Sequence, residues 1–96
     1  MIAGASASPT NRIARRDLEQ FRRSIKAWER QGQEAGRDGD VELAAGYAED
    51  VADLRAILRL IETGALDEAA EAIERLDTLI RDQIPQRVYD AVVPSS

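Results

Sequence analysis

Apolar residues recur at alternating intervals of three and four between Val41 and Ile84, and this periodicity constrains the fold more than any other feature of the sequence. Residues three and four positions apart share one face of an α-helix, so each such stripe must be covered by another element. The first stripe consists of Ala44, Tyr47, Val51, Leu54, Leu58 and Ile61. The second consists of Leu66, Ala69, Ile73, Leu76 and Ile80. The pattern predicts two helices, over residues 40–62 and 65–83, joined by a tight turn at residues 63–64.

Residues near the ends of these two segments fit the assignment. Asp40 is suited to cap the free amides at the start of the first helix, and Gly64 readily adopts the left-handed conformation that ends it. Pro85 lacks a backbone donor and disfavours a helical conformation at Ile84, so the second helix should stop just before that point. We expect a short helix over residues 86–92 to follow and to fold back against one end of the bundle.

A further helix is predicted over residues 9–31, because Ser8 and Thr10 are suitable caps and Pro9 is tolerated in a first turn. Its apolar stripe consists of Ala14, Leu18, Phe21, Ile25 and Trp28. The nine mostly polar residues 31–39 include three glycines, and glycine costs a helix about 1 kcal/mol relative to alanine, so this segment is predicted to be a loop. A loop of this length lets the N-terminal helix pack on its own hairpin or on that of a second copy, and both arrangements stay open.

These elements predict an all-α fold. The expected architecture is a three-helix bundle, made of a long helical hairpin and an N-terminal helix, with a short C-terminal helical turn. The 96 residues suggest one domain over residues 1–96. Because a chain of this size buries only a modest core, we also expect a homodimer, in which a second copy supplies further burial.

Cysteine and histidine are both absent from the sequence. Their absence removes disulfides, thiolate nucleophiles, the commonest general base and the commonest metal ligands. No serine or threonine has a histidine to activate it, so we expect no enzyme activity, no metal site and no cofactor. The first ten residues lack a signal-peptide pattern and no stretch is long and apolar enough for a membrane span, so we expect a cytoplasmic protein with no membrane contact.

The net charge of -5 is distributed unevenly along the chain. Residues 9–31 contain seven basic and three acidic side chains, whereas six arginines and fifteen carboxylates follow from Gly32 onward. The basic group consists of Arg12, Arg15, Arg16, Arg22, Arg23, Lys26 and Arg30. Such a helix could bind phosphates, but Asp17, Glu19 and Glu29 interrupt it and the acidic remainder would repel a polyanion. Direct binding to nucleic acid is therefore not expected.

The carboxylates of the second and third helices predict a different kind of partner. An acidic surface is attracted to the basic groove of a nucleic-acid-binding protein, and complementary charge raises the association rate and selects partners. The residues expected to contact such a protein are Glu49, Asp50, Asp53, Glu68, Glu71, Glu74 and Asp77, together with Arg15, Arg22 and Arg23. An acidic surface that only keeps the protein in solution is the alternative.

Two stretches in the second half of the chain also carry a family resemblance. They are the Gly-Ala-Leu-Asp turn at residues 64–67 and the Ile-Pro-Gln-Arg-Val-Tyr sequence at residues 84–89, and the similar texture extends over residues 48–92. In these features the chain resembles small acidic helical proteins of phages and mobile elements, in particular an all-helical anti-CRISPR family directed at type I effector complexes.

The resemblance implies a non-enzymatic inhibitor in the cytoplasm of the host bacterial cell. Such an inhibitor would dock on basic subunit surfaces of a type I CRISPR surveillance complex and block the binding of target DNA. The basic N-terminal helix departs from a uniform DNA mimic and leaves room for a wedge between subunits. The alternative function is a small structural or regulatory helical homodimer, such as a phage assembly factor or an antitoxin-like partner binder.

Overall fold

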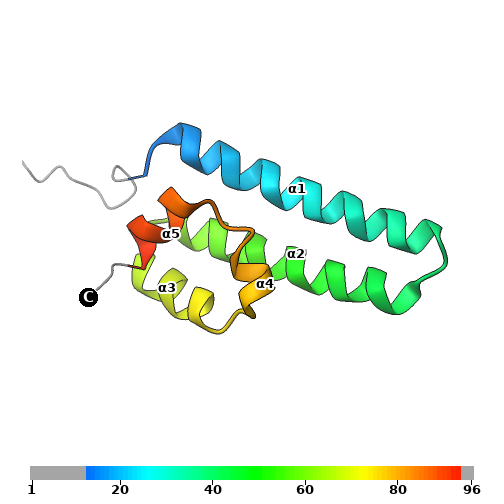
Figure 1. The fold of residues 1–96 in the computed structure, drawn as a ribbon. Coiled ribbons are helices and arrows are strands. Elements are labelled where there is room, and N and C mark those ends of the chain that lie inside the picture. The colour runs from blue at the N-terminus through cyan, green and yellow to red at the C-terminus, as the bar shows by residue number, and fades with distance from the viewer. Residues whose placement is uncertain (1–12, 94–96) are drawn as a thin grey trace, which may run out of the picture.

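The computed structural model describes residues 13–93, and in this part of the chain every regular element is a helix (Figure 1). The helices are α1 (Arg15–Arg37), α2 (Val41–Glu62), α3 (Leu66–Glu74), α4 (Thr78–Arg81) and α5 (Gln86–Val92). The prediction of an all-α fold is confirmed for these residues. The predicted helix over residues 9–31 begins too early, because Ile13 and Ala14 are not helical and α1 begins at Arg15. The predicted caps at residues 8–10, the basic residue Arg12 and the tail at residues 94–96 lie outside the described part.

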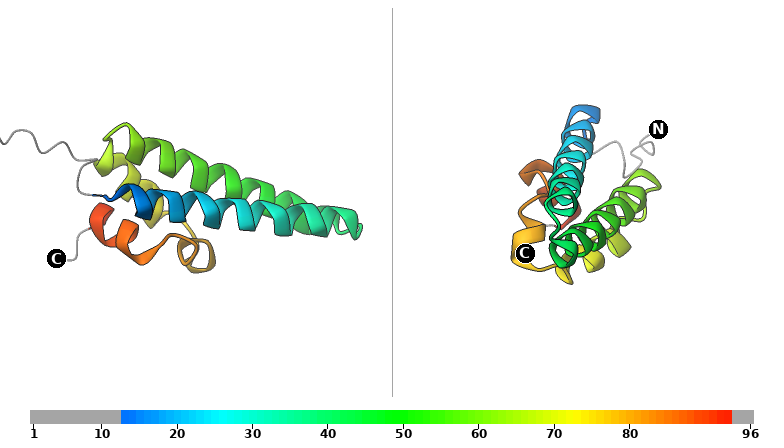
Figure 2. Two further views of the ribbon diagram at one scale, coloured as in Figure 1. Left: turned by 90° about the horizontal axis from the view of Figure 1, so that it is seen from above. Right: turned by 90° about the vertical axis from the view of Figure 1, so that its right-hand side faces the viewer.

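The two long helices, α1 and α2, run antiparallel and pack against each other (Figures 1 and 2). The short helices α3, α4 and α5 gather on the half of this pair where α1 begins and α2 ends (Figure 1). There α5 contacts both α1 and α3, as the prediction of a terminal helix folded against the bundle requires. The other half of the pair, next to the link between α1 and α2, extends beyond the short helices.

The predicted loop over residues 31–39 is wrong, because α1 continues to Arg37 and only residues 38–40 connect it to α2. A Cβ atom on Gly32 would lie 2.6 Å from the Cβ of Tyr47, so this glycine permits a close approach of the two helices. A Cβ atom on Gly36 would lie 3.7 Å from the Ala44 Cβ, which is an ordinary contact. Close packing at Gly32 thus offsets the low helix propensity of glycine, and the short link sets α1 beside α2 of the same chain.

The predicted helix over residues 65–83 is also wrong in one respect, because it is divided into α3 and α4. Asp77 has extended backbone angles (φ -66°, ψ 153°) and precedes α4, a position that aspartate favours over a helix interior. The guanidinium of Arg81 donates hydrogen bonds to the carbonyl oxygens of Leu76 (2.8 Å) and Glu74 (3.4 Å) at the end of α3. The break redirects the chain so that α5 returns to α1 (Figure 1).

Both long helices end in the same motif. After α2, the amide of Ala65 donates to the carbonyl of Leu60 and the amide of Gly64 to that of Ile61, and Gly64 has φ +85°. This is a Schellman motif, which needs a residue in the left-handed region. Gly39 has φ +86° and ends α1 with the corresponding pair of bonds. The predicted cap is confirmed as well, since a carboxylate oxygen of Asp40 accepts a hydrogen bond from the Leu43 amide at 3.2 Å.

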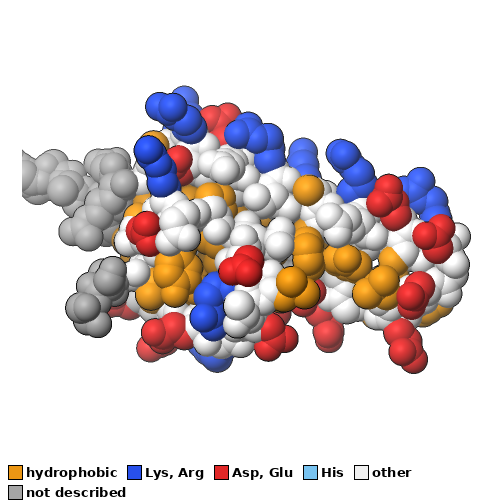
Figure 3. Space-filling view, viewed as in Figure 1, with side chains coloured by type: hydrophobic (Ala, Val, Ile, Leu, Met, Phe, Trp, Pro, Cys, Tyr) orange, Lys and Arg blue, Asp and Glu red, His pale blue; other side chains and the backbone are white. Residues whose placement is uncertain are grey.

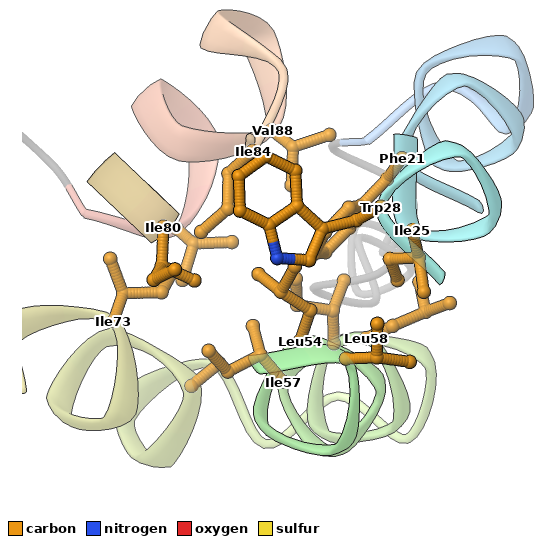
Figure 4. Packing of buried hydrophobic residues seen from close by; sticks show 14 of the residues in the cluster. Phe21, Ile25, Trp28, Leu54, Ile57, Leu58, Ile73, Ile80, Ile84 and Val88 are labelled. Carbon is orange, nitrogen blue, oxygen red and sulfur yellow. The ribbon is translucent and has the colours of Figure 1, made fainter. Parts of the chain in front are cut away.

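The core lies where the short helices cover the long pair (Figure 4). Its members come from every helix, and those that Figure 4 labels are Phe21, Ile25, Trp28, Leu54, Ile57, Leu58, Ile73, Ile80, Ile84 and Val88. The predicted stripe of α1 is buried from Phe21 to Trp28, whereas Leu18 is half-buried and Ala14 is exposed. Ile57 lies off the predicted stripe of α2 and is also buried, because α2 contacts α3 as well as α1.

Candidate functional site

Charged side chains are distributed unevenly between two edges of the molecule. In Figure 3 lysine and arginine predominate along the upper edge, which is formed by α1, and acidic side chains predominate along the lower edge, over α2 and α3, where some arginines also lie. The separation follows from the pairing of the helices, because α1 presents to solvent the face opposite its contact with α2. The uneven charge of the sequence thus becomes a molecule with a basic edge and an acidic edge.

The acidic edge contains six of the seven carboxylates that the sequence predicted as contacts. All six are exposed on α2, on α3 or in the link between α3 and α4: Glu49, Asp53, Glu68, Glu71, Glu74 and Asp77. None of them lies within 4.0 Å of a basic group in residues 13–93, where the ion pairs are Arg22–Glu62 and Arg55–Glu29. Their negative charge is therefore directed to solvent, where it can attract a cationic surface.

Asp50 differs from these six carboxylates. It is half-buried, and one of its oxygens accepts a hydrogen bond from the Nε1 of Trp28 at 3.4 Å. The indole of Trp28 also makes an edge-on contact with the ring of Tyr47, with 4.9 Å between ring centroids. Asp50 thus holds a core aromatic residue in place, a role that sequence periodicity did not indicate.

The three arginines predicted as contacts are on α1, away from the six carboxylates of the acidic edge. Arg15 and Arg23 are exposed on α1, and Arg22 forms an ion pair with Glu62 of α2. The structure therefore does not bring these arginines together with the acidic edge. A single flat partner surface contacts one edge or the other, and only a partner that wraps around the molecule reaches both.

A surface cleft of about 470 Å³ lies between α1 and α2. Its walls include Gly32, Gly36, Ala44 and Ala48, and the ion pair between Glu29 and Arg55 (3.1 Å) stands among them. These walls offer no nucleophile beside a base. Within residues 13–93 no three acidic, cysteine or histidine side chains lie close enough to hold a metal ion, and no helix there is long and apolar enough to cross a membrane.

Large apolar side chains are exposed at three positions that sequence reasoning did not single out as surface features. Val41 is 73% exposed, Leu43 50% and Leu79 66%. Leu43 is in the part of α2 that extends beyond the short helices, and Leu79 is on α4. No feature of the sequence marked Leu43 as exposed, because the predicted helix over residues 65–83 is almost as long as α2, whereas α3, α4 and α5 leave part of this 22-residue helix without cover.

Comparisons with known proteins do not place the chain in a family. It matches no protein-family model, no curated protein and no solved structure. The resemblance of residues 48–92 to anti-CRISPR proteins therefore stays a prediction.

Proposed function

We propose that the chain is a non-enzymatic inhibitor that binds the basic, nucleic-acid-binding surface of a protein partner through its acidic edge. The observation that carries this proposal is the set of six exposed carboxylates without ion-pair partners in residues 13–93. They project from helices that pack against the core, so the negative charge is held in a fixed arrangement. A fixed array of charge loses less conformational entropy on binding than a flexible acidic segment does.

The charge of the acidic edge supports selectivity and fast association more than affinity. Complementary potentials steer a partner towards the surface and exclude partners of the same sign. A protein that normally receives a nucleic acid presents the matching potential, because it must neutralise phosphates with lysine and arginine. Occupation of that surface by the acidic edge would exclude the nucleic acid.

A type I CRISPR surveillance complex is the first partner to test, because of the family resemblance in residues 48–92. The proposed action is to block target DNA binding at basic subunit surfaces in the bacterial cytoplasm. Purified full-length chain should bind an assembled type I complex and reduce its binding to target DNA. The affinity should fall as the salt concentration rises, since charge pairs at a surface are screened by ions.

Charge reversal identifies the edge that binds. In one variant Glu49→Lys, Asp53→Lys, Glu71→Lys and Glu74→Lys reverse four charges of the acidic edge, and binding should fall at least about tenfold because each charge pair contributes fractions of a kcal/mol or more. Two double variants with the same change of charge are then compared. Glu71→Lys with Glu74→Lys alters the acidic edge, and Glu19→Lys with Glu34→Lys is the matched control on α1. No binding of the unchanged chain at low salt, or equal binding by both double variants, would exclude the proposal.

A second function is favoured by a separate observation. The short helices leave part of the α1–α2 pair uncovered, and Leu43 and Leu79 are at least half exposed. We propose as the alternative a structural or regulatory homodimer in which a second copy covers these side chains. Replacement of both leucines by glutamate should convert such a dimer to a monomer in light scattering, and a chain that is already monomeric would rule the alternative out.

A further inference from the structure

The outer face of α1 carries a regular stripe of cations. Arg16, Arg23, Arg30 and Arg37 recur every seven residues, and Arg15 and Lys26 lie beside them. Seven residues make almost two helical turns, so the four arginines repeat about every 10.5 Å along one face. All six side chains are exposed, on the side of α1 away from the buried residues of the core. We call these six residues the arginine stripe.

Two of the acidic residues that interrupt the basic run in the sequence do not interrupt it in space. Asp17 is half-buried and lies four residues before the buried Phe21, so it is on the inner side of α1. Glu29 is four residues after the buried Ile25 and pairs with Arg55 of α2 at 3.1 Å. Three exposed acidic side chains lie near the six cations: Glu19, Glu34 and, next to Arg37, Asp38.

Repulsion from the acidic edge is also smaller than the sequence suggests. The acidic edge lies on the far side of α2 from α1 (Figure 3). Two packed helices have axes 8–10 Å apart and diameters of 10–12 Å, which separates their outer edges by about 20 Å. The Debye length at physiological salt is about 8 Å, so the acidic edge contributes little to the potential at the arginine stripe.

We propose that the arginine stripe binds the phosphate backbone of a nucleic-acid duplex without reading its sequence. Arginine matches phosphate with two parallel hydrogen bonds, and five of the six cations are arginine. A helix of this diameter fits the major groove of DNA, which is about 12 Å wide. Arg15 and Lys26 lie to one side of the line of four arginines, so the cations spread across the outer face of α1.

A duplex fits the stripe better than an acidic protein does. Double-stranded DNA carries about one charge per 1.7 Å of its axis, so a long stripe of cations lies in a strongly attractive potential in any register. An acidic protein would instead need carboxylates at intervals of about 10.5 Å along a straight surface. This inference goes beyond the proposed function, because it uses the opposite edge of the molecule and a different class of ligand.

Fluorescence anisotropy with purified full-length chain and a labelled DNA duplex of about 20 base pairs tests the proposal. The duplex should bind with a Kd in the range of about 1–100 μM, equally for unrelated sequences, and more weakly at about 200 mM than at about 50 mM salt. The double variant Arg23→Glu and Arg30→Glu should bind at least about tenfold more weakly and should lower the salt slope by about 2.

The matched control is the double variant Arg75→Glu and Arg87→Glu, which makes the same change of charge directly after α3 and on α5. It should bind the duplex as the unchanged chain does, and circular dichroism should show the same helicity and Tm for both variants. Absence of duplex binding at low salt, or equal loss in both double variants, would overturn the proposal. If polyglutamate displaces the labelled duplex as effectively as unlabelled duplex does, the proposal is also overturned, and an acidic protein becomes the ligand of the arginine stripe. None of these results bears on the acidic edge, which the assay with the protein partner tests separately.

Discussion

Gly32 lies at a close approach of α1 and α2, and its missing side chain has a measurable consequence. In Gly32→Ala the new Cβ would lie 2.6 Å from the Cβ of Tyr47, and neither atom can move without its backbone. The overpacking should lower the free energy of unfolding by about 1–3 kcal/mol, more than the gain of about 1 kcal/mol that alanine brings to a helix interior. Chemical denaturation followed by circular dichroism measures the difference.

Gly36 provides the control for this prediction, because it lies one helical turn further along the same helix. A Cβ atom there would be 3.7 Å from the Ala44 Cβ, an ordinary contact. Gly36→Ala should therefore leave the stability unchanged or raise it by up to about 1 kcal/mol. Equal destabilisation by the two substitutions would show that the close approach at Gly32 is not what selects glycine.

Asp50 and Glu49 are adjacent carboxylates on α2 with different surroundings. Asp50 is half-buried and accepts a hydrogen bond from Trp28, whereas Glu49 is exposed. Asp50→Ala should reduce the free energy of unfolding by about 1 kcal/mol, the typical net contribution of one hydrogen bond. Glu49→Ala should change it by less than about 0.5 kcal/mol. Urea denaturation followed by the fluorescence of Trp28, the single tryptophan, compares them, and equal effects would contradict the structural role of Asp50.

At the scale of the elements, Arg81 joins α4 to the end of α3. Its guanidinium donates to the carbonyl oxygens of Leu76 and Glu74, which α3 leaves without helical partners. Arg81→Ala should lower the free energy of unfolding by about 1.5–3 kcal/mol, as expected for hydrogen bonds from a charged group. The exposed Arg87 on α5 is the control, and Arg87→Ala should have almost no effect in the same denaturation experiment. A loss of similar size in both variants would mean that Arg81 acts only through its charge.

The apolar periodicity predicted the helical segments, but neither the bounds of α1 nor the division into α3 and α4. Spacings of three and four identify the buried face of α1 and α2, since a helix places those residues together. The same rules treat glycine as a breaker, and at Gly32 a tertiary contact with Tyr47 reverses that preference. The break at Asp77 has a comparable origin, because the return of α5 to α1 and the bonds from Arg81 form only after the chain has turned.

The candidate site shows the same limit. The sequence shows that acidic residues follow basic ones, but the position of each group depends on how α1 and α2 pair. A predicted loop of nine residues left that pairing open, whereas the short link at residues 38–40 sets α1 directly beside α2. Two separate charged edges result, and the half-buried position of Asp50 depends on a contact with Trp28 that spans 22 positions in the sequence.

At the scale of the whole molecule, the uneven cover of the long pair predicts a gradient of local stability. The part of α1 and α2 near Phe21 and Leu54 packs against the short helices, whereas the part near Leu43 extends beyond them (Figure 1) and exposes apolar surface. Amide hydrogens in α2 should therefore exchange faster before Tyr47 than after Val51 in a dilute sample, because local opening there exposes less buried surface. Hydrogen exchange measured by mass spectrometry tests this.

The dependence of the gradient on protein concentration distinguishes a dimer from a monomer. If a second copy covers Leu43, protection of this segment should rise with protein concentration. If the protein acts as a monomer, the gradient should be independent of concentration. Uniform protection along α2 at the lowest concentration would contradict the gradient itself.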